Sequence, residues 1–323
     1  MPAANLVEQL VKYLADAHAI ETQALAQLRT APDIAEDPGL ESAFREHLEE
    51  TEGQERLIRE RLEAHGGKPS PVKEAVMAAG GKGFILFARS QSDTPGKLTA
   101  HALSYEALEF ASYELLMRVA ERAGDPQTAE AARTIRDEEH RMMDRLEGCF
   151  DGAAEASLAA KGAEDAASEI NGYLADAHAI EAQALQLLDK ARDIGGDTEL
   201  QRLYAEHLEE TRGHQRLLEG RLQERNAGPS KLKDAAMRAG ALNWAMFFGA
   251  QPDTPGKLAA FAFAFEHLEI GGYELLKRVA AKAGDTETIR VVDEILAEER
   301  SAADKIAATF DRAAEASLEA VGA

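Results

Sequence analysis

Hydrophobic positions recur every three or four residues along most of this chain, and the β-branched and aromatic clusters typical of strands are scarce. This spacing is that of amphipathic helices. It predicts long helices at about residues 6–28, 37–66, 94–124 and 126–150, with a shorter amphipathic segment, Val72 to Phe87, between the second and the third. We therefore expect an all-α fold.

Capping and turn residues mark the ends of these helices. Asp37 followed by Pro38, and Thr94 followed by Pro95, are read as N-caps with proline at the first helical position. The run Gly124-Asp125-Pro126 predicts a tight turn, which makes the third and fourth helices antiparallel neighbours. Two helical hairpins joined by a longer connection form a four-helix bundle with one crossover, the ferritin-like arrangement.

The whole pattern occurs twice, at a constant offset of 160 positions. The run from Tyr13 to Glu21 returns letter for letter as Tyr173 to Glu181. A repeat of this length indicates a duplicated domain, because the units of solenoid proteins are much shorter. We predict two tandem ferritin-like four-helix bundles over residues 1–162 and 163–323, each with an extra short helix in its crossover.

Composition narrows the classes of partner. The net charge of −22 argues against nucleic acid or an anionic membrane as a partner and favours cations. The single cysteine, Cys149, excludes an internal disulfide framework and a thiolate metal cage. No apolar run approaches the ~20 residues that span a bilayer, and the first residues lack the basic start and apolar stretch of a signal peptide. A cytoplasmic location is the expectation.

Carboxylates interrupt the apolar stripe of every predicted long helix. An ionised carboxylate in an apolar interior costs several kcal/mol unless it is paired, and few lysines or arginines fall on the inward faces. Two divalent ions per domain would balance four such carboxylates, and the oxygen and imidazole donors suit Fe, Mn or Zn. The stripe carboxylates, one per helix in each copy, are Glu21, Glu50, Glu109 and Glu139, then Glu181, Glu210, Glu269 and Glu299.

Further acids and histidines share these faces. His47 and its counterpart His207 each lie three residues before the second-helix glutamate, so both side chains project from one side of the helix. Glu106 and Glu266 precede the third-helix glutamate by three and could bridge two ions or support the ligands. Two more histidines, which could either orient the first-helix glutamate or bind metal, are His18 and His178.

The copies differ at one inward position of the second helix, where the first has Gln54 and the second has His214. An imidazole is the better ligand for a transition metal, so stronger binding is expected in the second copy. Tyr113 and Tyr273 are expected in the core, where a phenol could hydrogen-bond a ligating carboxylate. Histidines without a counterpart in the other copy, expected at the surface, are His65, His101 and His140.

The run His47-Leu-Glu-Glu-Thr51, together with the run from Glu106 to Glu114, resembles the YciE/YciF-type ferritin-like family of bacterial stress-associated proteins. The resemblance covers both copies nearly end to end. It implies a rubrerythrin-like bundle with a dinuclear metal centre, a dimeric assembly and ferroxidase-like chemistry. The ligands it implies are Glu21, His47, Glu50, Glu106, Glu109 and Glu139, with Glu181, His207, Glu210, Glu266, Glu269 and Glu299 in the second copy.

The sequence departs from the usual di-iron pattern in one respect. That pattern has Glu-x-x-His on two helices. The positions three after the glutamates of the second and fourth helices instead hold Gly53 and Met142 in the first copy, and Gly213 and Ala302 in the second. We therefore expect a carboxylate-rich, histidine-poor site.

Three functions remain open on this basis. One is a redox enzyme that oxidises Fe(II) or removes peroxide at two metal ions per domain, with O₂ or peroxide as the partner. Another is a metal-binding stress protein without turnover, and the third is a purely structural helical module. The duplication predicts a covalent pseudo-dimer within one chain and leaves further self-association open. No catalytic residue and no physiological substrate is assigned.

Overall fold

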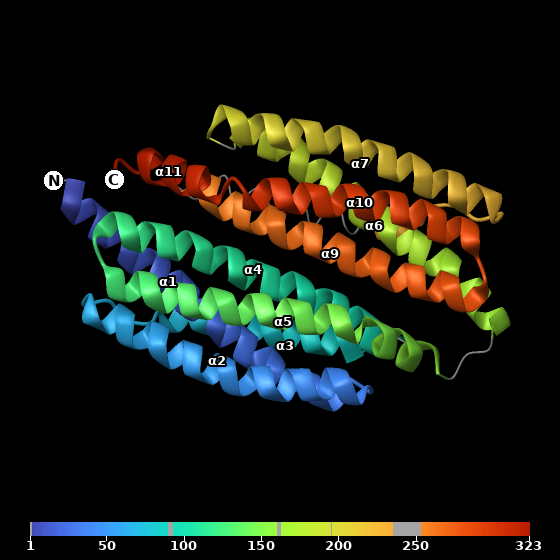
Figure 1. The fold of residues 1–323 in the computed structure, drawn as a ribbon, viewed down its shortest axis with the longest axis horizontal. Coiled ribbons are helices and arrows are strands. Elements are labelled where there is room, and N and C mark those ends of the chain that lie inside the picture. Colours follow the sequence, from blue (N-terminus) through green and yellow to red (C-terminus); the bar gives the residue numbers. More distant parts are fainter. Residues whose placement is uncertain (1, 90–92, 160–162, 195, 235–252) are drawn as a thin grey trace. The chain divides into compact units, whose positions relative to one another are not determined.

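The computed structural model describes residues 2–89, 93–159, 163–194, 196–234 and 253–323, and every regular element in this part of the chain is helical (Figure 1). The predicted all-α fold is thereby confirmed. Packing divides the chain into one unit of Met1–Ser157 with Val321–Ala323, and a second unit of Leu158–Ala320. The boundary predicted after Gly162 lies outside the described residues.

The first unit contains the long helices α1 (Pro2–Leu28), α2 (Pro38–Ala64), α4 (Thr94–Ala123) and α5 (Pro126–Leu158). Helix α1 packs against both α2 and α4, while hydrogen bonds from Gln54 and Arg61 link α2 to α5. The predicted crossover helix is α3 (Pro71–Arg89), which lies on α1 and α4. A short 3-10 helix, η1 (Ala31–Ile34), joins α1 to α2.

The second unit repeats this order with α6 (Ala163–Ile194), α7 (Thr198–Glu224), α9 (Thr254–Ala283) and α10 (Thr286–Ala307). Helix α6 packs on α7 and α9, and α10 packs on the same two helices. The extra crossover helix predicted from Leu232 to Phe248 falls mostly outside the described residues, although 231–234 are helical.

The two copies differ in their last helix. Helix α5 is continuous over 33 residues, whereas its counterpart is divided into α10 and α11 (Phe310–Ala320). At the break the Thr309 hydroxyl donates to the carbonyl of Ile306 at 2.6 Å. A threonine hydroxyl that bonds a nearby carbonyl competes with the helical hydrogen-bond ladder, which is the local reason for the interruption.

The apolar stripes predicted for the helices form the cores of the two units. In α1 the stripe is buried along its whole length, from Leu10 to Leu28, and the matching stripe of α6 is buried from Ile170 to Leu188. The predicted stripes of α5 and α10 are also buried, including Ile135 in α5 and Ile295 in α10. Because each stripe follows the helical period, one face of every long helix is fixed toward the centre of its bundle.

Helix N-termini follow the prediction at α2 and depart from it at α4. Asp37 caps α2, and its carboxylate accepts from the amide of Leu40 at 2.8 Å. At α4 the N-cap is Asp93 rather than Thr94, and its side chain makes no capping bond. The hydroxyl of Ser157, at the far end of α5, instead accepts from the amide of Gly96 at 2.9 Å. Because Ser157 lies 61 residues after Gly96, the sequence around the start of α4 does not reveal this cap.

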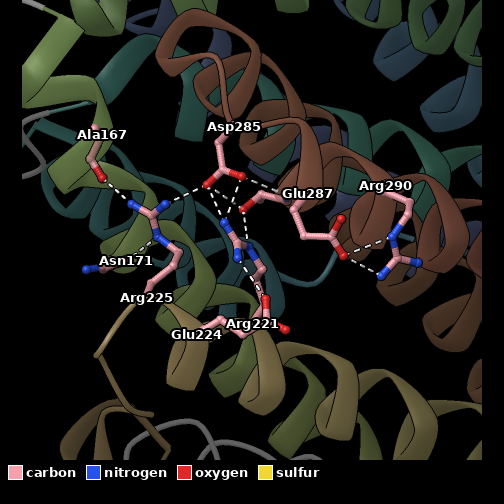
Figure 2. Close-up of polar contacts among 9 residues, drawn as sticks. Ala167, Asn171, Arg221, Glu224, Arg225, Asp285, Glu287 and Arg290 are labelled. Carbon is pink, nitrogen blue, oxygen red and sulfur yellow. Dashed lines mark hydrogen bonds and ion pairs between the residues drawn. The ribbon is translucent and has the colours of Figure 1, made fainter.

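The turn between the last two long helices is closed by an ion-paired aspartate. Gly124 ends α4 with a left-handed φ of 74°, as the tight turn requires. In the second unit the carboxylate of Asp285 accepts from Arg221 Nη2 at 2.7 Å and from Arg225 Nη1 at 2.5 Å (Figure 2). Arg225 also donates to Asn171 of α6, so this aspartate links three segments of the unit.

The first unit has the same turn with a histidine in place of the second arginine. Asp125 pairs with Arg61 at 2.9 Å and with His65 Nε2 at 2.6 Å. His65 is half-buried, and so is His101, which corrects the surface position predicted for both. His140 is exposed, as predicted.

Among the described residues, no helix is both long and apolar enough to cross a lipid bilayer.

Candidate metal centre

Buried polar side chains from three helices converge in the interior of the first bundle. His47 comes from α2, Glu106 and Glu109 from α4, and Glu139 from α5, and a donor atom of each lies within 4.8 Å of one from every other. His47 Nε2 lies 3.0 Å from Glu106 Oε2 and 3.4 Å from Glu139 Oε2. The three-residue spacing of the α4 glutamates places both on one face of that helix.

Two further carboxylates lie near this cluster. Glu21 of α1 is fully buried and accepts a short hydrogen bond from the phenol of Tyr113, so the predicted possibility that this tyrosine binds a carboxylate is confirmed. Glu50 lies 3.1 Å from His47 Nδ1 and also pairs with Arg145 of α5 at 3.1 Å. Because a carboxylate is an acceptor, this contact favours a proton on Nδ1 and leaves the Nε2 lone pair directed at the cluster.

Glu50 differs from the burial predicted for it. Its side chain is 28% exposed, whereas the stripe glutamates of the other three helices are almost completely buried. Three residues along a helix rotate it by about 300°, which leaves the two side chains about 60° apart, so His47 takes the inward position and Glu50 lies at the edge of the bundle. Its counterpart Glu210 is similarly placed, 31% exposed and paired with Lys305 at 3.4 Å.

The interior acids lack partners to an unusual degree. Both carboxylate oxygens of Glu109 and both of Glu139 are buried without a hydrogen bond, as are Glu21 Oε2, Glu106 Oε2 and His47 Nε2. Most buried polar atoms in proteins have a partner. An ion that binds donors at about 2.1 Å keeps neighbouring donors roughly 3.0 to 3.4 Å apart, which is the separation observed around His47. The donor set therefore fits a divalent ion of the Fe, Mn or Zn class.

The electrostatics of the cluster show how strongly burial opposes its negative charge. Burial raises the pKa of Glu21 to about 8, although the Tyr113 hydrogen bond and His47 act in the other direction. Burial, reinforced by neighbouring carboxylates, also raises the pKa of Glu109 well above its usual range. Burial alone would lower the pKa of His47, but Glu106 and Glu139 raise it well above its ordinary value. A metal ion bound here would therefore compete with protons for the same groups.

The second unit repeats this arrangement. His207, Glu266, Glu269 and Glu299 form the equivalent group, also within 4.8 Å of one another, with His207 Nε2 3.0 Å from Glu266 Oε2 and 3.6 Å from Glu299 Oε2. His207 Nδ1 lies 3.0 Å from the edge glutamate Glu210. Both carboxylate oxygens of Glu269 are buried without a hydrogen-bond partner, as are those of Glu109 in the first unit.

Glu181 occupies the place in the second unit that Glu21 has in the first. It is fully buried, and the phenol of Tyr273 donates a short hydrogen bond to it, as Tyr113 does to Glu21. Glu181 also forms a second group with His214 and Glu299. The sequence placed His214 on the inward stripe of its helix and predicted that it would strengthen metal binding in the second copy, although it was not among the predicted ligands. Its position seven residues after His207 was the available signal.

The other predicted histidine pair lies elsewhere. The two ring nitrogens of His18 face Glu55 of α2 at 2.9 Å and Glu74 of α3 at 3.2 Å. His178 likewise faces Glu219 and Asp234, at 3.2 and 3.1 Å. These histidines therefore join α1 and α6 to neighbouring segments and do not orient the glutamate three residues later.

One family model matches this chain twice. The family is described as Domain of unknown function (DUF892), and the matches cover residues 5–159 and 172–319. No solved structure matches the chain. Each family match therefore spans one complete set of the helices that supply a buried carboxylate–histidine cluster.

Proposed function

We propose that this chain, which belongs to the DUF892 family in both halves, is a ferritin-like, metal-binding protein of the bacterial stress-protein type that oxidises Fe(II) or removes peroxide. The observation that carries the proposal is the pair of buried carboxylates without a hydrogen-bond partner on either oxygen, Glu109 in the first half and Glu269 in the second. Uncompensated charge of this kind would destabilise a helical bundle by several kcal/mol, and divalent ions remove the penalty.

The ligands proposed for the first half are the buried His47 cluster, Glu21, and Glu50 at the edge of the bundle. Bound iron or manganese would supply one-electron redox chemistry toward O₂ or peroxide. The chain contributes a fixed imidazole, because Glu50 holds His47 Nδ1, and a carboxylate oriented by Tyr113. The helices of the bundle exclude water from the acids between them. The proposed ligand set is Glu21, His47, Glu50, Glu106, Glu109 and Glu139, with Glu181, His207, Glu210, Glu266, Glu269 and Glu299 in the second half.

The edge glutamates suggest where ions enter. In the second unit a shallow surface depression between α7 and α10 is lined by His207 together with Glu206, Glu210 and Lys305. A cation that approaches this depression meets the carboxylate of Glu210 before it meets the buried cluster. The same side chain touches His207 Nδ1, so it connects solvent with the first buried ligand.

Metal analysis and iron oxidation test this proposal separately. The purified protein should retain at least one Fe or Mn ion per chain, and chelation should lower its melting temperature. Fe(II) oxidation, followed optically, should be faster than in buffer and should be reduced in the Glu109→Leu, Glu269→Leu double variant. Exposed Glu52→Leu is the matched control. Less than one ion per chain with unchanged melting refutes metal binding, whereas oxidation no faster than buffer refutes the redox activity alone.

We also propose that the duplicated chain supplies in one polypeptide the two domains that single-domain relatives would bring together as a dimer. The constant repeat offset and the two family matches support this proposal. Light scattering should give the mass of a single chain. A tetramer of chains would contradict it.

A further inference from the structure

The two metal centres differ in composition at one buried position, although the chain repeats the other ligands. Helix α7 carries His214, which is 1% exposed, whereas α2 carries Gln54 at the equivalent place. Both side chains make the same outward contact, since His214 Nε2 lies 2.8 Å from Glu298 and Gln54 Nε2 donates to Glu138 at 3.1 Å. The two side chains therefore differ at their other polar atom, which is Nδ1 in His214 and Oε1 in Gln54.

In the second unit this atom is an imidazole nitrogen, a strong metal ligand, and two carboxylates lie beside it. His214 Nδ1 lies 2.9 Å from Glu299 Oε1 and 3.4 Å from Glu181 Oε1. The other oxygen of Glu299 faces His207, at 3.6 Å from Nε2. The two oxygens of one carboxylate thus face two different histidines, which is the arrangement of a ligand that bridges two ions.

In the first unit the corresponding atom is a weak ligand. Gln54 uses its amide nitrogen on Glu138, and the remaining Oε1 is buried without a hydrogen-bond partner. A neutral amide oxygen binds Fe, Zn or Co far less strongly than imidazole does. Among the described residues of this unit, Glu139 belongs to the His47 group alone, whereas Glu299 belongs to two groups.

We infer that the second half binds two transition-metal ions bridged by Glu299, whereas the first half binds one, at the His47 group. The inference rests on the proposed function, because it requires that these clusters bind metal. It assigns His214 as a metal ligand and makes Gln54 the residue that limits the first half to one tightly bound ion.

A competing explanation gives His214 a different task. A protonated imidazole between Glu181 and Glu299 would neutralise part of their charge, and the two carboxylates do raise the pKa of His214, to about 11, against the effect of burial. In that case His214 replaces an ion instead of binding one. The two explanations predict different numbers of bound ions.

Counting Co(II) ions in the full-length chain distinguishes them. Apo-protein is loaded with excess Co(II), desalted and analysed for metal, and the ligand-field absorption band is recorded. We expect three ions per wild-type chain, two in His214→Gln and four in Gln54→His. The Gln54→His variant matters most, because a gained ion cannot result from misfolding, and circular dichroism checks that all three proteins are folded.

The electron paramagnetic resonance spectrum of the Mn(II)-loaded protein provides a second measurement. An exchange-coupled pair should be present in wild type, absent in His214→Gln and doubled in intensity in Gln54→His. Two or four ions in wild type, or a coupled pair that survives His214→Gln, overturns the inference while leaving metal binding intact. Less than one ion per chain refutes the proposed function, and the inference with it.

Discussion

Replacing Glu109 by leucine should make the metal-free protein more stable than wild type and the metal-loaded protein less stable than wild type. Glu109 is 1% exposed, and neither of its carboxylate oxygens has a hydrogen-bond partner. Leucine has a similar volume and no polar atoms. In the metal-free protein the substitution therefore removes a buried, unpaired polar group, whereas in the loaded protein it removes a ligand.

The two effects have comparable magnitudes and opposite signs. Relief of an unsatisfied buried polar group is worth about 1–3 kcal/mol, so the metal-free variant should be more stable than wild type by that amount. A ligand present at 1,000 times its dissociation constant stabilises the native state by about 4.1 kcal/mol. If the variant loses this linkage, loaded wild type should exceed it by roughly 1–3 kcal/mol.

Urea unfolding followed by circular dichroism, in a chelator and in excess Mn(II), measures both differences. Glu109→Leu should move only the transition of the first unit, and Glu269→Leu, its equivalent, only that of the second. Exposed Glu52→Leu should change the free energy of unfolding by no more than about 0.5 kcal/mol under either condition. A metal-free Glu109→Leu protein less stable than wild type, or an unchanged order with Mn(II), would refute the reasoning.

Further predictions concern pH and two hydrogen-bonded groups. The folded-state pKa of Glu21 lies at about 8, above its ordinary 4.5, so its contribution to metal-free stability is complete below about pH 4.5 and should be lost as pH rises through 8. The melting temperature in a chelator should therefore fall between about pH 4.5 and 8, and Mn(II) should restore it. A melting temperature that rises with pH in the chelator would contradict the predicted sign of this effect. Tyr113→Phe should cost the metal-free protein about 1.5–3 kcal/mol by calorimetry, because a buried hydrogen bond to a carboxylate is lost, and an unchanged melting temperature would count against that bond. Asp285→Ala removes the helix cap and the partner of Arg221 and Arg225, so urea titration should show a loss of about 2–4 kcal/mol in the second unit, and a loss below 1 kcal/mol would show that these contacts add little.

Helical periodicity was sufficient to identify most of the interior, because a side chain's direction on a helix follows from its position alone. Glu21, Glu109 and Glu139 are all buried for this reason. The same reasoning failed for Glu50, because periodicity predicts the direction of a side chain but not how much of it a neighbouring helix covers. It also could not show that Arg145, nearly a hundred residues later, reaches Glu50 across the bundle edge.

Contacts between residues distant in sequence account for the remaining differences. The sequence placed His18 near the glutamate of its own helix, but its ring nitrogens are held by Glu55 and Glu74 from two other helices. Neither the repeat nor the residue spacing predicts which of several nearby carboxylates a histidine will contact. The carboxylate-rich, histidine-poor composition could be predicted, whereas the sharing of Glu299 between two groups required the packed structure.

The serine that caps α4 also has a consequence for biosynthesis. The amide of Gly96 is satisfied by Ser157, so the start of α4 acquires its cap only after the end of α5 has left the ribosome. Gly256 depends in the same way on Ser317, within the second unit. Each copy therefore carries the residue that completes it. Since domains fold as units from the N-terminus during translation, the first bundle can close while the second is still being synthesised.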